Sequence, residues 1–254
     1  YPFRLEADWP IPRTQWTKLY LQPQQDTPVP SGVEGALASE APAASAKITY
    51  EASPGRRHYH GGRTGVSFAT PPMTQETEIT GPIVLNVWVS STANDMDIMA
   101  TLRNIGPDGK DVCEVGQRGD PVPCLTKGWL RASHRKLDGA KSLPYRPYHA
   151  HDERWWLKPD EIVECQVEIW PTSMVFAKGH RLQLDIGPRD GVGTGHFTHY
   201  HADYNQAAHN TIHAGGERAS YLLLPVIPAK ERRHLGRDRH WTATYRLGVE
   251  SCEP

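Results

Sequence analysis

The chain has 254 residues, and its 28 Lys and Arg nearly balance its 29 Asp and Glu, for a formal net charge of -1 at pH 7. No basic stripe is present, so we expect no nucleic-acid partner. No apolar run approaches the ~20 residues of a membrane helix, so we expect no membrane partner either.

The chain begins at Tyr1 without a methionine, a basic segment or an apolar segment ahead of it, so we expect no signal peptide. The strand-like start, with Phe3 and Leu5, indicates a fragment of a longer protein or a processed product. The localisation and the redox compartment stay open.

Period-two alternation of apolar and polar residues predicts a succession of short strands. Turn signals separate these strands, and no amphipathic helix exceeds two turns. An all-β class follows, as an antiparallel β-sandwich or jelly roll, because the crossover helices of a parallel α/β domain are missing. The expected strands cover residues 17–21, 35–38, 47–50, 77–79, 83–90, 97–104, 111–115, 128–134, 163–169, 182–186, 219–226 and 240–247.

One β-sandwich domain is expected over residues 1–254, with its core at about 8–228. Residues 22–46 are rich in Pro, Gln, Ser and Ala, and we interpret them as a surface excursion that contains one short strand at 35–38. Residues 229–254 form a C-terminal extension in this interpretation.

Three connections carry specific expectations. Gly81-Pro82 is expected to separate two strands, and the Pro107-Asp108-Gly109 turn is expected to return residues 111–115 as the hairpin partner of 97–104. Residues 170–181 hold Pro171 and Gly179 together with apolar residues at 174–176. We interpret them as a connection that crosses over the edge of the sandwich.

The four cysteines are too few for a disulfide framework. Cys113 and Cys124 are placed to pair across a hairpin if the compartment is oxidising. Cys165 lies on the apolar side of a predicted strand, which indicates a buried thiol.

No recognisable catalytic centre is present in the sequence. Gly65-Val-Ser67-Phe-Ala69 is the nearest match to a nucleophile elbow, but it lacks the second glycine and a following helix. We therefore expect no nucleophile here and no catalytic residue in the chain.

A histidine-rich loop is expected at residues 187–216. His199, His201 and Asp203 alternate along it and would share one face, which suits a divalent ion of the zinc class. The alternative, which we favour, is that these polar side chains anchor a long loop through hydrogen bonds. We therefore expect no bound metal and no cofactor.

Asp95 and Asp97 flank Met96 at the start of a predicted strand. Two carboxylates in this arrangement suit calcium together with loop carbonyls. The alternative, which we favour, is that they accept backbone N–H groups and pair with an arginine.

Aromatic residues gather in the irregular segment before residue 161: Trp155 and Trp156, with Tyr145, Tyr148 and His151. Exposed aromatics stack on sugars or line the mouth of an enzyme. They also form the apolar side of domain interfaces, and we favour this second role.

Several short motifs follow one another in an order that resembles a known family, and the resemblance covers residues 8–228. It is the C-terminal domain of the cocaine esterase and X-Pro dipeptidyl-peptidase family of serine hydrolases, also called CocE/NonD. The motifs are Asp8-Trp9-Pro10 with Leu19-Tyr20-Leu21, Thr80-Gly81, Asp95-x-Asp97, Leu102 to Pro107-Asp108-Gly109, Gly128-x-Leu130-Arg131-Ala132, and Pro171-Thr172-Ser173 with Gly179-His180-Arg181.

The resemblance implies a jelly-roll sandwich similar to galactose-binding domains. In the family this domain follows an α/β-hydrolase domain that bears the Ser-His-Asp triad, so no triad residue is carried over to this chain. The implied role is to pack on that N-terminal domain, to shape the substrate entrance and to contribute contacts between copies of the protein. His180 is then a structural residue at the start of a strand, and His180 and Arg181 join the interface candidates.

Two other functions stay open at this point. The chain is alternatively a stand-alone carbohydrate- or ligand-binding jelly-roll module, or a metal-dependent enzyme built on the histidine loop. The substrate of the parent enzyme and the oligomeric state stay open as well.

Overall fold

A computed structural model describes residues 5–23, 33–52, 65–115, 121–123, 125–189, 208–228 and 250–251. Among these residues it contains strands and one short 3₁₀ turn, η2 (Ala132–His134), but no α-helix. The predicted all-β class is confirmed. The strands are β1 (Gln15–Pro23), β2 (Gly35–Ala38), β3 (Ala46–Glu51), β4 (Val66–Ala69), β5 (Thr77–Ser91), β6 (Asp97–Ile105), β7 (Val112–Val115), β8 (Pro121–Pro123), β9 (Leu125–Arg131), β10 (Val163–Phe176), β11 (Arg181–Gly187), β12 (His209–Ala214), β13 (Tyr221–Ile227) and β14 (Glu250–Ser251).

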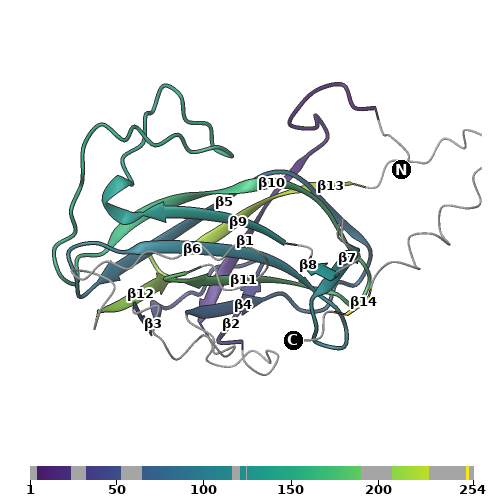
Figure 1. Cartoon of the computed structure of the whole chain (residues 1–254), viewed down its shortest axis with the longest axis horizontal. Helices are drawn as coiled ribbons and strands as arrows, with labels where there is room; N and C mark the ends of the chain where they lie inside the picture. The colour runs from purple at the N-terminus through teal and green to yellow at the C-terminus, as the bar shows by residue number, and fades with distance from the viewer. Residues whose placement is uncertain are drawn as a thin grey trace, which may run out of the picture.

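Nine strands follow one another around a closed, barrel-like sheet (Figure 1). Their order is β10-β9-β6-β11-β4-β2-β1-β13-β5, and β5 pairs back onto β10. β12 continues the sheet from the far half of β5, and β3 lies outside β12. All of these pairs are antiparallel except β2 with β4, which is parallel.

The core lies inside this closed sheet, where alternate residues of opposite strands meet. On β5, Leu85, Val87 and Val89 are fully buried in it, and on β10 their neighbours Val167 and Cys165 are buried as well. The period-two pattern therefore identified the buried face correctly. The largest fully buried side chains are Phe68, Phe176, Leu21, Leu37, Ile79, Ile83, Leu85, Met96, Ile98, Leu102, Ile169 and Leu182.

Gly81-Pro82 does not separate two strands, because β5 runs through it without interruption. The register of β10 against β5 shifts between Ile169 and Thr172, and that of β13 shifts between Leu223 and Val226. Proline cannot donate to a ladder, and Pro82, Pro171 and Pro225 all lie at this level of three adjacent strands. The register shifts of β10 and β13 thus accommodate the missing N–H donors of the prolines, and β5 continues as one strand.

The segment after Ile169 was also predicted wrongly. Residues 170–176 are the second half of β10, which pairs with β5 as far as Phe176, and only residues 177–180 connect β10 to β11. Met174 and Phe176 are buried because they continue the alternation of the strand beyond the bulge. The chain does cross here, since β11 pairs with β6 and β4 rather than with β10.

β7 is not the hairpin partner of β6. The turn at Pro107-Asp108-Gly109 forms as predicted, with Gly106 N donating to Lys110 O at 2.8 Å. However, both edges of β6 are already occupied, by β11 on one side and β9 on the other. β7 therefore leaves after a single bridge from Ile105 to Asp111 and forms a small separate sheet, β14-β7-β8.

The short strand predicted at residues 35–38 forms as β2, but its placement in a surface excursion is wrong. β2 lies between β1 and β4 in the closed sheet, and its Leu37 belongs to the core. Residues 24–32 lie outside the described residues. The short apolar run of β2 carries too little alternation to distinguish a buried strand from a surface strand in the sequence.

The two described cysteines differ in state. Cys165 is a free, buried thiol, as predicted. Cys113 on β7 is in a disulfide bond. The predicted partner Cys124 lies outside the described residues, as do the predicted strand at 240–247 and most of the C-terminal extension.

Candidate functional site

A long irregular segment connects η2 to β10 and is the longest such segment among the described residues; we call residues 132–162 the arm. In Figure 1 the arm leaves the end of β9, rises above the strands and returns to the start of β10. Two isolated bridges, Leu137 with His149 and Leu143 with Arg146, fold it back on itself. The arm is therefore not an open loop. It has an outgoing limb, which leads away from η2, and a returning limb, which leads back to β10.

Backbone hydrogen bonds hold the base of the arm in place. Within the arm, Trp155 N donates to Ser133 O at 2.8 Å and Ala150 N donates to Lys136 O at 3.0 Å. Toward the sheet, Leu157 N donates to Asn94 O at 2.8 Å. These bonds satisfy the backbone of an irregular segment and fix the direction in which its side chains project.

The tip of the arm reaches β1 on the outer face of the sheet. The rings of Tyr145 and Trp16 stack at 4.8 Å between centroids, with 8° between their planes. Leu19 and Leu21 of β1 face the core, so Trp16, Lys18 and Tyr20 lie on the opposite face. The arm thus crosses from β9 and β10 to the N-terminal strand.

Three aromatic side chains remain exposed on the arm; we call them the arm surface. They are Tyr148, Trp155 and Trp156, which are 46%, 41% and 50% exposed. Each carries a cation over its ring, namely Lys141, Arg135 and Arg154. The predicted aromatic group is therefore split, since Tyr145 stacks on β1 while the other three rings face solvent.

Three histidines meet at the base of the arm. The Nδ1 atoms of His134 and His151 lie 2.9 Å apart, within hydrogen-bond distance. The ring centroid of His149 lies 6.0 Å from that of His151, and its buried Nε2 has no hydrogen-bond partner. Burial, reinforced by the neighbouring His151, lowers the pKa of both His134 and His149.

Asp95 and Asp97 make the contacts of the hydrogen-bonding interpretation. Asp95 Oδ1 accepts the backbone N–H groups of Met96 and Ser133, both at 2.9 Å. Asp97 Oδ1 accepts from Nε of Arg131 at 3.0 Å. These carboxylates tie the start of β6 to the end of β9 and to the base of the arm.

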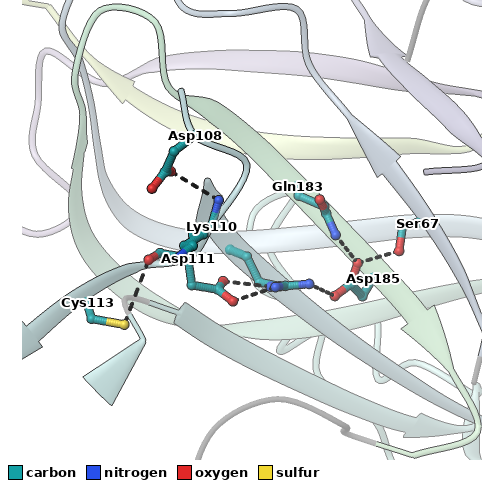
Figure 2. Close-up of polar contacts among 8 residues, drawn as sticks. Ser67, Asp108, Lys110, Asp111, Cys113, Gln183 and Asp185 are labelled. Carbon is teal, nitrogen blue, oxygen red and sulfur yellow. Dashed lines mark hydrogen bonds and ion pairs between the residues drawn. The ribbon is translucent and has the colours of Figure 1, made fainter. Parts of the chain in front are cut away.

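Ser67 has no histidine among its hydrogen-bond partners in the described part of the chain. Its Oγ donates to Asp185 Oδ1 at 2.6 Å, and the same oxygen accepts from Gln183 Nε2 at 2.7 Å (Figure 2). Ser67 is also buried on β4. Its hydrogen bond to Asp185 links β4 to β11, which is a structural role.

The same carboxylate belongs to an ion network on the outer side of β6 and β11. Arg103 Nη1 donates to Asp185 Oδ2 at 2.9 Å, and its other two nitrogens bind Asp111. Burial disfavours the charge of Arg103, but its bonds to Asp111 and the charge of Asp185 outweigh this, so its pKa lies above the usual value. Cys113 Sγ is 3.8 Å from Asp111 O (Figure 2), but a disulfide sulfur has no proton to donate.

His180 and Arg181 lie at the start of β11. His180 Nδ1 is 3.1 Å from Asn104 Oδ1, and Arg181 Nη1 donates to Thr70 O at 2.8 Å. Both side chains therefore brace the connection from β10 to β11. They lie apart from the arm in the sequence, and their role as interface residues stays a prediction.

The predicted histidine loop is shorter than expected. Residues 190–207, with His196, His199, His201 and Asp203, lie outside the described residues. His209 and His213 belong to β12, and His213 Nε2 is 3.0 Å from Ser90 Oγ. Within the described ranges, no three or more His, Cys, Asp or Glu side chains are grouped to hold a metal ion. Those ranges also contain no helix long and apolar enough to cross a membrane.

Sequence reasoning missed the histidine group and the Arg103 network. The spacing His149-x-His151 in the irregular segment was a signal for the first. The second had no local signal, because Arg103, Asp111 and Asp185 come together only through the pairing of β6 with β11.

Comparison with known proteins identifies a family and relatives that this chain resembles. The X-Pro dipeptidyl-peptidase C-terminal non-catalytic domain matches residues 2–223. A putative serine esterase of Mycobacterium tuberculosis is 31% identical over 167 residues, which are 64% of this chain and 24% of that protein. The cocaine esterase of a Rhodococcus species is 25% identical over 253 residues, covering 89% of this chain and 40% of that protein.

Solved structures agree on the fold. A CocE/NonD family hydrolase from Staphylococcus aureus superposes with a TM-score of 0.71 at 24% identity, over 89% of this chain and 39% of that one. An aminopeptidase from a marine sediment archaeon superposes with a TM-score of 0.59 at 15% identity, over 89% of this chain and 39% of that one. The chain thus spans between a quarter and two fifths of the length of these relatives. It belongs to the family of X-Pro dipeptidyl-peptidase C-terminal non-catalytic domains, as found in CocE/NonD hydrolases.

Proposed function

We propose that this domain serves a serine ester or amide hydrolase by packing on an α/β-hydrolase domain and shaping the entrance for its substrate. The observation that carries the proposal is the family match over residues 2–223. The relatives by sequence are named as esterases, so ester hydrolysis is the favoured activity of the whole protein. The chain itself contributes no catalytic residue in this proposal and needs no cofactor.

Turnover by the chain alone and by a longer polypeptide tests this function. The 254-residue chain is expected to hydrolyse neither p-nitrophenyl acetate nor an Xaa-Pro-anilide above the buffer rate. A polypeptide in which an α/β-hydrolase segment precedes Tyr1 is expected to turn over at least one of them. Hydrolysis by the isolated chain that disappears in Ser67→Ala would contradict the proposal, because it would locate a nucleophile on β4.

We further propose that the arm surface is the contact for the hydrolase domain. Three exposed aromatics on one segment are the kind of side chain that interface centres favour. The arm also meets β1 through Tyr145 and Trp16, and the catalytic part precedes a C-terminal domain in the chain. The arm and the N-terminal segment, with its exposed Trp9, rise on the same side of the strands in Figure 1.

Alanine substitutions in the 254-residue chain test this contact. Trp155→Ala and Trp156→Ala are each expected to weaken association of the two domains by roughly 30-fold, as for a hot-spot tryptophan. The measurement is isothermal titration of the hydrolase domain with the 254-residue chain. Trp170→Ala is the matched control, since this tryptophan is 63% exposed but belongs to β10. Equal losses in all three variants would contradict a specific arm contact.

The finer fold class is also a proposal: a jelly roll similar to galactose-binding domains, folded as one domain. Its support is a nested set of antiparallel pairs, β1 with β13, β4 with β11, β5 with β10 and β6 with β9. Eight strands paired from the outside inward in this way are what winding one long hairpin around a core produces. Cross-strand nuclear Overhauser effects between β5 and β10 and between β6 and β9 test this nesting.

Two remaining expectations need separate tests. Contacts between copies of the chain stay a prediction, which light scattering of the purified protein checks. The stand-alone ligand-binding module is not favoured, because the family assignment places this domain in hydrolases. Specific retention on a glycan array would restore it.

A further inference from the structure

The histidine group joins the two limbs of the arm at its base. His134 is the last residue of η2 on the outgoing limb, and His149 and His151 lie on the returning limb. Around them, the limbs are joined by backbone bonds, with Ala150 N on Lys136 O and Trp155 N on Ser133 O. The contact between His134 and His151 is thus one cross-link among several, and it is made by two imidazoles, whose ring nitrogens donate or accept according to their protonation.

The 2.9 Å distance between the two Nδ1 atoms restricts their protonation. One Nδ1 must donate a proton and the other must accept it, so at least one imidazole is neutral in this geometry. When both are protonated, no lone pair remains and two positive charges face each other. The contact therefore exists only in the neutral or singly protonated state of the pair.

The surrounding charges act mainly against protonation. For His134, burial is the leading cause of the lowered pKa, followed by His151 and the cations Arg131 and Arg154, with Asp95 opposing. For His149, burial again leads and His151 follows, with the backbone of Gln166 on β10 opposing. Directly after His151, Asp152 and Glu153 both form ion pairs with Lys136 of the outgoing limb.

The returning limb carries the histidines and the exposed tryptophans together. Trp155 lies four residues after His151, and Arg135, next to His134, donates to both Ala132 O and Trp155 O. A loss of the histidine contact at the base would therefore loosen the backbone that positions Trp155 and Trp156.

We propose that the His134–His151 contact, flanked by His149, is a pH-dependent latch that keeps the arm closed at neutral pH and releases it when both imidazoles are protonated. The direction follows from the lowered pKa values: the open arm takes up protons near the ordinary histidine value of about 6.5, whereas the closed arm resists them. The arm is closed above that pH and opens progressively as the pH falls below it. The consequence for the hydrolase contact rests on the proposed function, but the latch itself does not.

Hydrogen exchange of the 254-residue chain, measured by NMR between pH 5 and 8, tests the latch without any hydrolase domain. After correction for intrinsic rates, the protection of the Ala150 and Trp155 amides is expected to fall by about tenfold or more toward pH 5. Amides that pair β5 with β10 are expected to keep their protection, which separates opening of the arm from global unfolding. Unchanged protection of the arm amides would overturn the proposal.

His151→Asn is expected to reduce the pH dependence of the protection of the arm amides to the part that His149 contributes. His180→Asn is the matched control, since burial lowers the pKa of this histidine as it does that of His134, but His180 lies at the start of β11. It is expected to keep the wild-type pH dependence. Retention of that dependence in His151→Asn would contradict the latch.

Side-chain nitrogen NMR of the wild-type chain provides a readout that needs no variant. His134 and His151 are expected to titrate as a coupled pair, with one Nδ1 protonated and one bearing a lone pair at pH 7.5. Two independent titrations near the ordinary histidine pKa would overturn the proposal.

Discussion

Arg103 and Asp111 meet as a two-bond fork, with Nε on Oδ1 at 2.8 Å and Nη2 on Oδ2 at 2.5 Å. The third nitrogen of the same guanidinium reaches Asp185 on the neighbouring strand β11. This geometry matches the planar fork of arginine to a carboxylate, which lysine cannot reproduce. One side chain thereby links β6, β11 and the turn that leads into β7.

Arg103→Ala is expected to lower the free energy of unfolding by about 3 kcal/mol, because it leaves two largely buried carboxylates without their cation. Arg103→Lys keeps the charge but loses the fork, so an intermediate loss is expected. Urea denaturation followed by circular dichroism measures both. A loss below about 0.5 kcal/mol in Arg103→Ala would mean that water solvates Asp111 and Asp185 well enough to replace the fork.

Gly128 allows β9 and β10 to approach each other. A Cβ at this position would lie 2.2 Å from Glu168 O and 2.9 Å from Ile169 Cα, and both are backbone atoms of β10. Gly128→Ala is therefore expected to destabilise the protein by about 3 kcal/mol, since the strands must separate. Gly139→Ala on the arm is the control, because nothing lies within 4 Å of its Cβ. A thermal melt that ranks the two variants equally would contradict the close approach.

Cys165 is expected to be unreactive in the native protein. Burial raises the pKa of its thiol to about 12, so the reactive thiolate is roughly a thousandfold rarer at pH 8 than for a free cysteine. Ellman's reagent is expected to label the native chain very slowly and to label it promptly in guanidinium. Cys165→Ala controls for labelling elsewhere. Fast labelling of the native wild-type protein would show that β10 opens at this position.

His213 is expected to make stability depend on pH. Burial, with Arg218 and Lys47 nearby, lowers its pKa, so between pH 6.5 and the folded value the unfolded chain binds more protons. The stabilisation is complete above about pH 6.5 and decreases as the pH falls toward the folded pKa. Denaturation between pH 5 and 7.5 is expected to show a steeper loss for the wild type than for His213→Gln. Because other histidines contribute with the same sign, only the difference between the two curves isolates this residue, and parallel curves would contradict the prediction.

The sequence alone determined the class, the family resemblance and the buried faces of the strands. Alternation is a local property, because the inward and outward positions of a strand follow from its own residues. It placed Cys165 and Leu85 correctly in the core. The Pro107-Asp108-Gly109 turn was also predictable because its residues define it without outside help. The ends of the strands were harder to predict from the sequence. Pro82 and Pro171 suggested breaks in the sequence, but β5 and β10 continue through them, with a register shift in the pairing of the two strands.

Only the tertiary structure decided which strands pair with each other. β7 is excluded as the partner of β6 because β9 and β11 occupy both edges of β6, which only the structure shows. β2 is recognised as a core strand only through its neighbours β1 and β4. The same holds for the arm. Its aromatics were visible in the sequence, but the division into a ring stacked on Trp16 and three exposed rings depends on how the arm crosses the sheet. His134 and His151 are brought to 2.9 Å by the folding of two limbs, and contacts between residues distant in sequence leave no period for a sequence pattern to reveal.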